Sequence, residues 1–315
     1  MRTLLAVFAL GICCLPAYAG ELKPIATVHL PCESRQQFVS PSGDQIVVHC
    51  SDHGLRLIDV ATGREQHAFT PADRVTGGDF SRDGRWFAVG LWDGSVEIVP
   101  TSGSGAPKRW QAGSRRIEGV RFLADGSIVI SAIDQPGQVW DVSGTPKPLA
   151  SLHADFAGMT ACAVSPDGKL LATAEGDTIL RVYDTSTWKI VSEYRGLKLE
   201  TFAVAFTGDG KYLLAGGADD HISVIDVSSG AEVHRLEGET GVVYGIFPLS
   251  GKPQVEALYA DADGIKPPHQ VVWDLDTRKA KPLITERAIT GGGVVRGKLW
   301  ATSADGSSLQ IWEYE

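Results

Sequence analysis

Apolar and polar residues alternate along most of this chain in short stretches, and each stretch ends at a turn rich in glycine, aspartate, serine or proline. An alternation with a period of two is typical of half-buried β-strands. β-Branched residues are frequent in these stretches, and proline is confined to turns and loops, as hydrogen-bonded strands require. The pattern predicts short antiparallel strands.

One turn segment recurs at a nearly fixed spacing. Steps of 41, 42, 42 and 42 residues separate its glycines, which are Gly43, Gly84, Gly126, Gly168 and Gly210. Weaker copies of the turn lie at 250–252 and 296–298. A fixed period of this length is typical of repeat folds, in which each repeat is one supersecondary unit. The chain therefore contains seven copies of one unit.

Each copy has the same surroundings. An alternating stretch precedes the turn, a small apolar strand follows it, and a loop with Asp or Gly leads to an apolar strand that ends in an acid. Those acids are Asp59, Asp141, Asp184, Asp226, Asp274 and Glu313, and Val99 takes the place in the second copy. With an outer strand added, this pattern predicts four antiparallel strands per copy.

Two features resemble WD40 repeats. The turn at 165–169 is followed by the small apolar strand 170–173, and Trp-Asp pairs stand at 140–141 and 273–274. The stretch 224–227 also resembles the related YVTN propellers. Trp-Asp appears in only two copies, and the Gly-His pair that usually opens a repeat is missing. The resemblance covers nearly all of residues 20–315 and implies a single all-β domain, a seven-bladed β-propeller of the bacterial secreted type. Such propellers have many unrelated roles.

The seventh copy ends after its third strand. The segment 24–30 precedes the first copy and is similar to the outer strands expected at 148–152 and 232–236. We therefore expect residues 25–30 to pair with residues 309–313 as the outer strand of the seventh blade. That pairing would close the ring and leave no open sheet edge.

The first nineteen residues have the pattern of a secretory signal peptide. Arg2 is followed by the apolar run 4–15, and the segment ends in Ala17-Tyr18-Ala19, which has the small-x-small form of a cleavage site. The apolar run has about twelve residues, whereas a membrane span needs roughly 20. We therefore expect cleavage near Ala19, a periplasmic or secreted protein, and no membrane span.

The chain is acidic, with a net charge of -9 at pH 7. Negative charge repels the phosphate backbone, so nucleic acid is excluded as an expected partner. We expect a monomer that requires no cofactor.

Three cysteines remain after residue 19, namely Cys32, Cys50 and Cys162. Cys32, Cys50 and the nearby histidines could be considered as a zinc site, but His49 and Cys50 point to opposite faces of a strand. Secretion favours oxidised thiols, and Cys162 lies in an inner strand where a buried free thiol is ordinary. We therefore expect a Cys32–Cys50 disulfide.

An acid recurs between the second and third strands of every copy. A ring of metal ligands is one interpretation, and hydrogen bonding within each blade is the one we favour. These acids are Asp52, Asp93, Asp134, Asp177, Asp220, Asp263 and Asp305. The segment 261–264 resembles the start of a calcium loop, but its continuation offers no further acid. We expect no metal site.

The sequence contains no linear catalytic motif. Propeller enzymes assemble sites from scattered acids and histidines around the central channel, so a lactonase-type or hydrolase-type enzyme with a channel-bound metal is the alternative interpretation. The favoured interpretation is a non-catalytic platform in the cell envelope that binds protein partners on the loop face.

The candidate partner-binding residues lie in neighbouring copies. Arg74 and the pair Arg115 and Arg116 begin adjacent inner strands, and Trp92 lies in the loop beside them. Arginine and large aromatics are enriched at the energetic centres of interfaces. The alternative interpretation is that these arginines are solvated charges on the rim of the propeller and that Trp92 is folded under its own loop. We expect an acidic partner, and we name His221 and the insertion 263–269 as the second candidate region.

Overall fold

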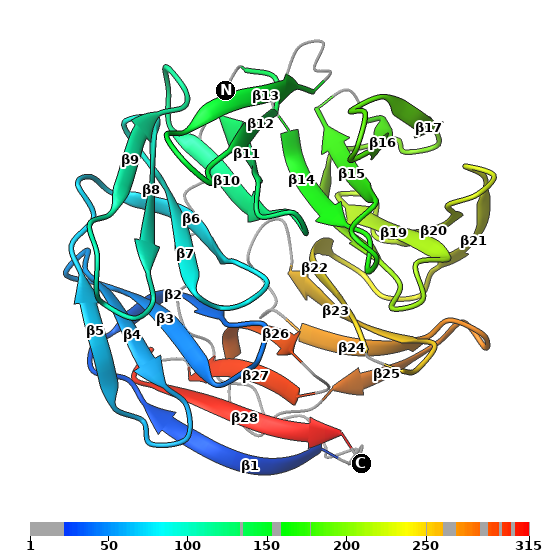
Figure 1. The fold of residues 1–315 in the computed structure, drawn as a ribbon. Helices are drawn as coiled ribbons and strands as arrows, with labels where there is room; N and C mark the ends of the chain where they lie inside the picture. The colour runs from blue at the N-terminus through cyan, green and yellow to red at the C-terminus, as the bar shows by residue number, and fades with distance from the viewer. Residues whose placement is uncertain are drawn as a thin grey trace.

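The computed structural model describes residues 22–132, 135–152, 159–176, 178–249, 251–260, 269–283, 289–295, 298–303 and 306–314. Within these ranges the chain forms β-strands and no helix, so no described segment is a helix that could cross a membrane. The strands form seven four-stranded sheets. Figure 1 shows these sheets arranged around a central axis as the blades of a wheel. The expected all-β, seven-bladed propeller is confirmed.

The strands of blades one to four follow one another from the centre outwards. Blade one contains β2 (Ser34–Val39), β3 (Gln45–Cys50), β4 (Leu55–Asp59) and β5 (Glu65–Phe69); blade two contains β6 (Val75–Phe80), β7 (Trp86–Leu91), β8 (Ser95–Pro100) and β9 (Lys108–Gln111); blade three contains β10 (Ile117–Phe122), β11 (Ile128–Ala132), β12 (Gln138–Asp141) and β13 (Lys147–Ser151); blade four contains β14 (Met159–Val164), β15 (Leu170–Glu175), β16 (Leu180–Asp184) and β17 (Ile190–Tyr194).

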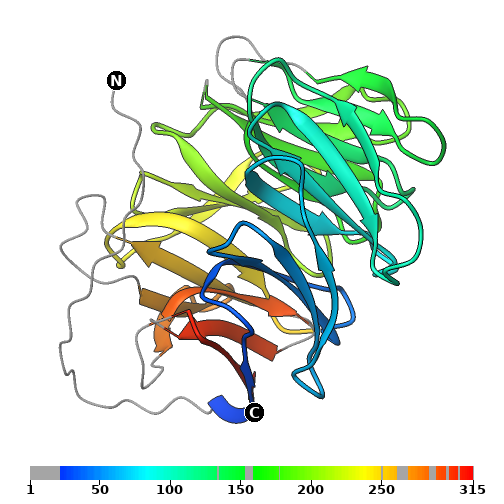
Figure 2. The same cartoon turned by 90° about the vertical axis from the view of Figure 1, so that its left-hand side faces the viewer.

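Blades five and six have the same order, and blade seven differs in its outer strand. Blade five contains β18 (Thr201–Phe206), β19 (Tyr212–Gly217), β20 (Ile222–Asp226) and β21 (Glu232–Leu236); blade six contains β22 (Val242–Pro248), β23 (Gln254–Ala260), β24 (His269–Asp274) and β25 (Lys279–Leu283); blade seven contains β26 (Ile289–Val295), β27 (Lys298–Ser303), β28 (Ser308–Tyr314) and β1 (Leu22–His29). Figure 2 shows the wheel from its side.

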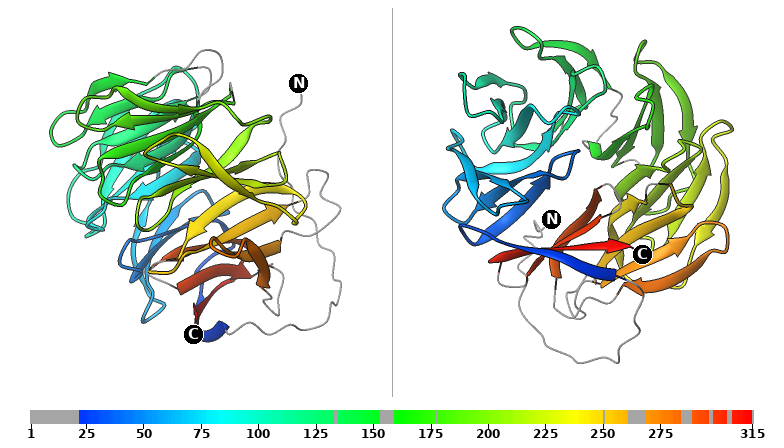
Figure 3. Two further views of the ribbon diagram at one scale, coloured as in Figure 1. Left: turned by 90° about the vertical axis from the view of Figure 1, so that its right-hand side faces the viewer. Right: turned by 60° about the horizontal axis from the view of Figure 1, so that its bottom comes forward.

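The pairing of the N-terminal strand with the last strand is confirmed. β1 runs antiparallel to β28, with Val28 opposite Leu309 and His29 opposite Ser308. The right-hand view of Figure 3 shows the two strands side by side, in blue and red. Val28 is buried in an apolar cluster with Ile46 and Ile311. The two ends of the described chain therefore share one sheet.

The recurring turn is held by its own side chains. In blade two, Ser81 Oγ donates a hydrogen bond to Asp83 Oδ1 at 2.6 Å, and the same oxygen accepts the backbone N–H of Arg85 at 3.1 Å. The bond from Ser81 is the main reason that the pKa of Asp83 falls to about 2. Gly84 has a φ of 71°, in the left-handed region that favours glycine. Serine, aspartate and glycine recur here because each satisfies a requirement of the turn.

The core consists of apolar layers between adjacent blades. One layer joins Val47 and Leu57 of blade one to Phe87 of blade two. Another joins Trp300 of blade seven to Ile46 of blade one. Layers of the same kind lie between blades two and three, three and four, four and five, and five and six. Each of these layers removes apolar surface of two sheets from water, which is the main favourable term in folding.

Candidate functional site

Every inner strand has an irregularity near its start. The register against the second strand shifts after the first paired residue of β2, β6, β10, β14, β18 and β26, and after the second paired residue of β22. The extra residue of such a bulge is left unpaired, and its side chain is re-aimed. In β2 to β22 these residues are Arg35, Thr76, Glu118, Thr160, Phe202 and Tyr244. These residues mark one face of the propeller, the face on which the connections between blades lie.

The structure brings Arg74 and Trp92 together at that end of blade two. Arg74 precedes β6 and Trp92 follows β7, and the backbone N–H of Trp92 donates to the carbonyl oxygen of Arg74 at 2.9 Å. The Cζ atom of Arg74 lies 4.3 Å from the centroid of the Trp92 ring. Cation–π attraction favours this arrangement of a guanidinium over an indole.

Arg116 completes the cluster from blade three. Its Cζ atom lies 4.9 Å from the centroid of the Trp92 ring. Both guanidinium groups therefore contact the indole ring, and Trp92 is 43% exposed, so part of it is accessible to a partner. Arg115 is exposed and precedes Arg116 in the chain. We call Arg74, Trp92, Arg115 and Arg116 the arginine–tryptophan surface.

The two arginines that contact Trp92 differ in their charge environment. Arg116 Nη2 forms an ion pair with Glu118 Oε1 at 3.0 Å. Across the described part of the chain, the Arg74 guanidinium has no carboxylate within ion-pair distance. Arg74 therefore offers the less compensated positive charge, and its N–H edges suit a planar anion. Sequence analysis did not identify Glu118, because its pairing depends on the bulge in β10.

The loop that carries Trp92 is anchored by the acid after it. Asp93 Oδ1 accepts the backbone N–H of Ser95 at 2.9 Å, and Asp93 Oδ2 pairs with Arg109 Nη2 at 2.6 Å. Burial acts to raise the pKa of Asp93, but the hydrogen bonds from Ser95 and the charge of Arg109 outweigh it and lower this pKa. The ionised carboxylate thus holds the loop against the outer strand β9.

A cavity of about 430 Å³ lies beside Arg74. The loop after β3 and the connection between blades one and two form its walls, and the lining residues are Asp52, His53, Gly54, Arg56, Thr70, Pro71, Asp73 and Arg74. A second cavity of about 270 Å³ extends from Thr70 and Pro71 between β5 and β8. The arginine–tryptophan surface is therefore bordered by a hollow at the junction of blades one and two.

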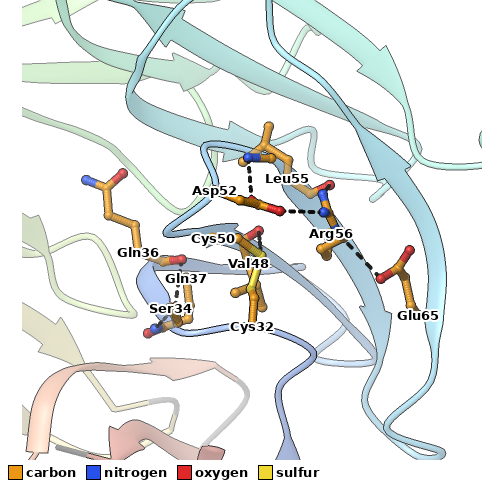
Figure 4. The surroundings of a disulfide bond; sticks show 11 residues. Cys32, Ser34, Gln36, Gln37, Val48, Cys50, Asp52, Leu55, Arg56 and Glu65 are labelled. Carbon is orange, nitrogen blue, oxygen red and sulfur yellow. Dashed lines mark hydrogen bonds and ion pairs between the residues drawn. A yellow bond between two sulfur atoms is a disulfide. The ribbon is translucent and has the colours of Figure 1, made fainter. Parts of the chain in front are cut away.

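A disulfide joins Cys32 to Cys50 at the edge of that hollow, with a Cα–Cα distance of 5.6 Å. Figure 4 shows it next to the ion pairs that Arg56 makes with Asp52 and Glu65. The disulfide ties the segment before β2 to the end of β3, just before the loop that lines the cavity. Among the described residues Cys162 is the free cysteine, and burial raises its pKa to about 11.

The loop acids that the structure describes form hydrogen bonds within the protein. Asp52 Oδ1 accepts the N–H of Gly54 at 2.9 Å within blade one. Asp220 Oδ1 accepts the N–H of Gly241 at 3.3 Å, which links blade five to blade six. The described residues include no group of three His, Cys, Asp or Glu side chains that could hold a metal ion. Asp134, Asp177, Asp263, Asp305 and the segment 261–264 lie outside the described residues.

The second candidate region lies apart from the arginine–tryptophan surface. His221 lies between β19 and β20, and its Nδ1 contacts the carbonyl oxygen of Asp219 at 2.7 Å. β19 and β20 lie across the wheel from β6 and β7 (Figure 1), so the structure does not bring His221 to the arginine–tryptophan surface. Most of the insertion 263–269 lies outside the described residues.

The central channel contains a pair that sequence analysis missed. Arg121 Nη1 of β10 lies 3.3 Å from Asp79 Oδ1 of β6, and the other oxygen of Asp79 accepts the N–H of Phe122 at 2.9 Å. The signal for this pair was weak, because Arg121 and Asp79 stand 42 residues apart, at equivalent places in neighbouring copies. The pair ties two inner strands together. The alternative of a channel enzyme stays a prediction.

A family model matches three parts of this chain. The family model of the WD domain, G-beta repeat, matches residues 63–98, 146–184 and 191–226. The protein is a seven-bladed β-propeller. Its chain contains WD40 repeats, as the Trp-Asp pairs and the recurring turn suggested.

Several curated proteins are similar to this chain. SEC12-like protein 1 of Arabidopsis thaliana is 28% identical over 61% of this chain and 52% of its own length. THO complex subunit 3 of Arabidopsis thaliana is 27% identical over 61% of each chain. U3 small nucleolar RNA-associated protein 15 homolog of Xenopus tropicalis is 26% identical over 50% of this chain and 30% of its own length. The chain thus spans less than two thirds of each of these relatives.

The comparisons correct the expected localisation. The relatives are eukaryotic proteins, and their names include a pre-mRNA-processing factor and an autophagy-related protein. The expectation of a periplasmic or secreted protein of a bacterial type is therefore wrong. It depended on one short apolar run after Arg2, a local pattern that carries no information from the rest of the chain. Residues 1–19 lie outside the described residues, so the signal-peptide assignment stays a prediction.

Proposed function

We propose that this protein is a non-catalytic platform that binds a protein partner through the arginine–tryptophan surface. The observation that carries the proposal is the partly exposed Trp92 ring in contact with the guanidinium groups of Arg74 and Arg116. Tryptophan and arginine are the residue types most enriched at the energetic centres of interfaces. The name of one relative, THO complex subunit 3, describes a component of an assembly and supports a role in binding.

The partner should present carboxylates to this surface, and the platform should act as a monomer. Arg74 has a planar fork of donors, held over Trp92 and facing no carboxylate among the described residues. A pre-positioned guanidinium loses little side-chain entropy when it binds a planar anion. Because the contact is charged and exposed, salt should weaken it.

Affinity capture from an extract of the source cells tests the proposal, with Arg74→Gln and Trp92→Ala as the variants. Each substitution should lower the yield of the partner about tenfold, as expected for truncation at an interface hot spot. Reversal of Arg116 to Glu is a weaker test, because Arg116 already pairs with Glu118 at 3.0 Å.

Arg85→Gln provides the matched control. Arg85 is also an exposed arginine of blade two, but it lies in the turn before β7, at the other end of the blade. The Arg85→Gln variant should capture the partner in the same yield as the wild type. Equal capture by the wild type, Arg74→Gln and Trp92→Ala would show that this surface is ordinary solvated protein.

A further inference from the structure

A second aromatic surface lies on the same face of the propeller, over blades five and six. Phe202 and Tyr244 occupy the bulges of β18 and β22, and their rings stack with centroids 5.7 Å apart and planes inclined by 18°. Tyr244 is 46% exposed, and Leu199, just before β18, is 51% exposed. Neighbouring exposed apolar side chains of this size mark sites of interaction.

This aromatic surface lies opposite the arginine–tryptophan surface. Figure 1 places β19 and β22 across the central channel from β6 and β7. Phe202 and Tyr244 lie at the start of their inner strands, and Arg74 directly precedes the start of its own. All three residues therefore lie on the face of the propeller that carries the connections between blades.

Three hydrogen bonds from backbone N–H groups hold acid-bearing segments together next to the aromatic pair in the chain. The loop after β19 is tied to the connection before β18 and to the connection before β22. The bonds run from Ala218 N to Glu200 O at 2.9 Å, from Lys198 N to Asp219 Oδ2 at 3.1 Å, and from Gly241 N to Asp220 Oδ1 at 3.3 Å. The segments that carry Glu200, Asp219 and Asp220 therefore lie together. Glu200 and Asp220 are exposed, whereas Asp219 is partly buried and its Oδ1 is removed from water. Lys198 is the neighbouring lysine.

The two sides of this face of the propeller thus differ in charge. The side over blades two and three carries Arg74 and Arg116 against the Trp92 indole ring, with the exposed Arg115 next to Arg116 in the chain. The side over blades five and six carries the stacked rings of Phe202 and Tyr244 with the exposed acids Glu200 and Asp220 and the partly buried Asp219, and we call it the acidic aromatic surface.

We propose that the acidic aromatic surface binds an arginine-bearing segment of the protein partner. This inference rests on the proposed function, since the same partner would reach Arg74 with its carboxylates. A planar guanidinium stacks on the exposed face of an aromatic ring, and nearby carboxylates favour its positive charge. Opposite charge preferences on the two sides of the channel fix the orientation of the partner, because the reversed orientation places like charges together.

A fluorescently labelled hexa-arginine peptide is the probe, and anisotropy at low ionic strength gives its dissociation constant with the full chain. Tyr244→Ala should weaken binding about fivefold, which is the size of an exposed cation–π contact. Tyr244→Phe keeps the ring and should bind as the wild type does. Melting curves establish that each variant is folded.

Charge reversal gives the second arm. Glu200→Lys should weaken hexa-arginine binding more than about fivefold, because it places a like charge beside the bound guanidinium. Asp167→Lys makes the same change in net charge in the turn after β14, at the other end of blade four, and should weaken binding less than about twofold. Equal weakening by both reversals, or wild-type affinity in Tyr244→Ala, overturns the inference.

Arg74→Gln separates this inference from the proposed function. It should leave hexa-arginine binding unchanged while it lowers capture of the partner. Capture that depends on Arg74 and not on Tyr244 would leave the proposed function standing and remove the acidic aromatic surface from it.

Discussion

Arg181 is an arginine that is almost completely removed from water. It is 1% exposed on β16, and its Nη1 lies 2.6 Å from Oε2 of Glu175, which is 2% exposed. Glu193 of the outer strand lies 3.4 Å from its Nε. A buried pair of this kind compensates a large desolvation cost, so it adds little net stability while both partners are present. Loss of one partner is costly.

Replacement of Arg181 by leucine should therefore lower the free energy of unfolding by about 3–5 kcal/mol, because Glu175 would be left as a buried, uncompensated charge. Urea unfolding measures the change. Arg195→Leu is the control, since Arg195 pairs with Glu193 at 2.7 Å but is 64% exposed. An exposed pair contributes less than about 1 kcal/mol, so a similar loss in both variants would contradict the argument.

His49 predicts a dependence of stability on pH. It is 4% exposed, and no hydrogen-bond partner of either ring nitrogen is found among the described residues. Burial first, and then the positive charges of Arg35 and His53, lower its pKa from 6.5 to about 4. The unfolded chain therefore takes up a proton below pH 6.5 that the folded protein does not accept until about pH 4.

Stability should accordingly be lost as the pH falls from about 6.5 towards 4, and the loss from His49 should reach about 2 kcal/mol near pH 5. Urea unfolding of the wild type and of His49→Leu at pH about 7 and about 5 isolates this contribution, since the carboxylates are common to both. The wild type should lose about 2 kcal/mol more than the variant. Parallel losses would assign the effect to other groups.

At the scale of the strand, β1 is the element whose predicted partner lies farthest away in the sequence, and that pairing was predicted correctly. Its pairing with β28 could be predicted because the last copy lacked an outer strand and the segment 24–30 was similar to outer strands elsewhere. The bulges could not be predicted in the same way, because one extra residue in an alternating stretch changes the face of a side chain without changing the composition. The Phe202–Tyr244 stack and the Arg116–Glu118 pair therefore appear only in the structure.

Deletion of residues 21–30 removes this strand and should lower the free energy of unfolding by at least about 3 kcal/mol, because buried apolar surface and a complete hydrogen-bonded ladder are lost. Thermal melting measures the effect. A chain that lacks only residues 1–19 is the control, and it should melt as the parent does. If the deletion of 21–30 melts like that control, β1 contributes nothing to the seventh blade.

At the scale of the whole molecule, repetition explains what could be read from the sequence and what could not. Each copy repeats its turn, its strands and its terminal acid, so the number of blades follows from counting. Contacts between copies are not repeated: Arg116 of blade three meets Trp92 of blade two, and Phe202 of blade five meets Tyr244 of blade six. The localisation failed for a different reason, because it depended on a segment outside the repeats.

The pairing of β1 with β28 also determines how the protein responds to mechanical force. Leu22 stands opposite Tyr314 at one end of this ladder, and His29 stands opposite Ser308 at the other. Tension applied between Leu22 and Tyr314 acts across the strands at one end, so the hydrogen bonds break one after another, as in a zip. Tension applied between Leu22 and Ser308 acts along the strands and loads all of the bonds together. The same ladder should therefore yield at low force in the first direction and resist in the second.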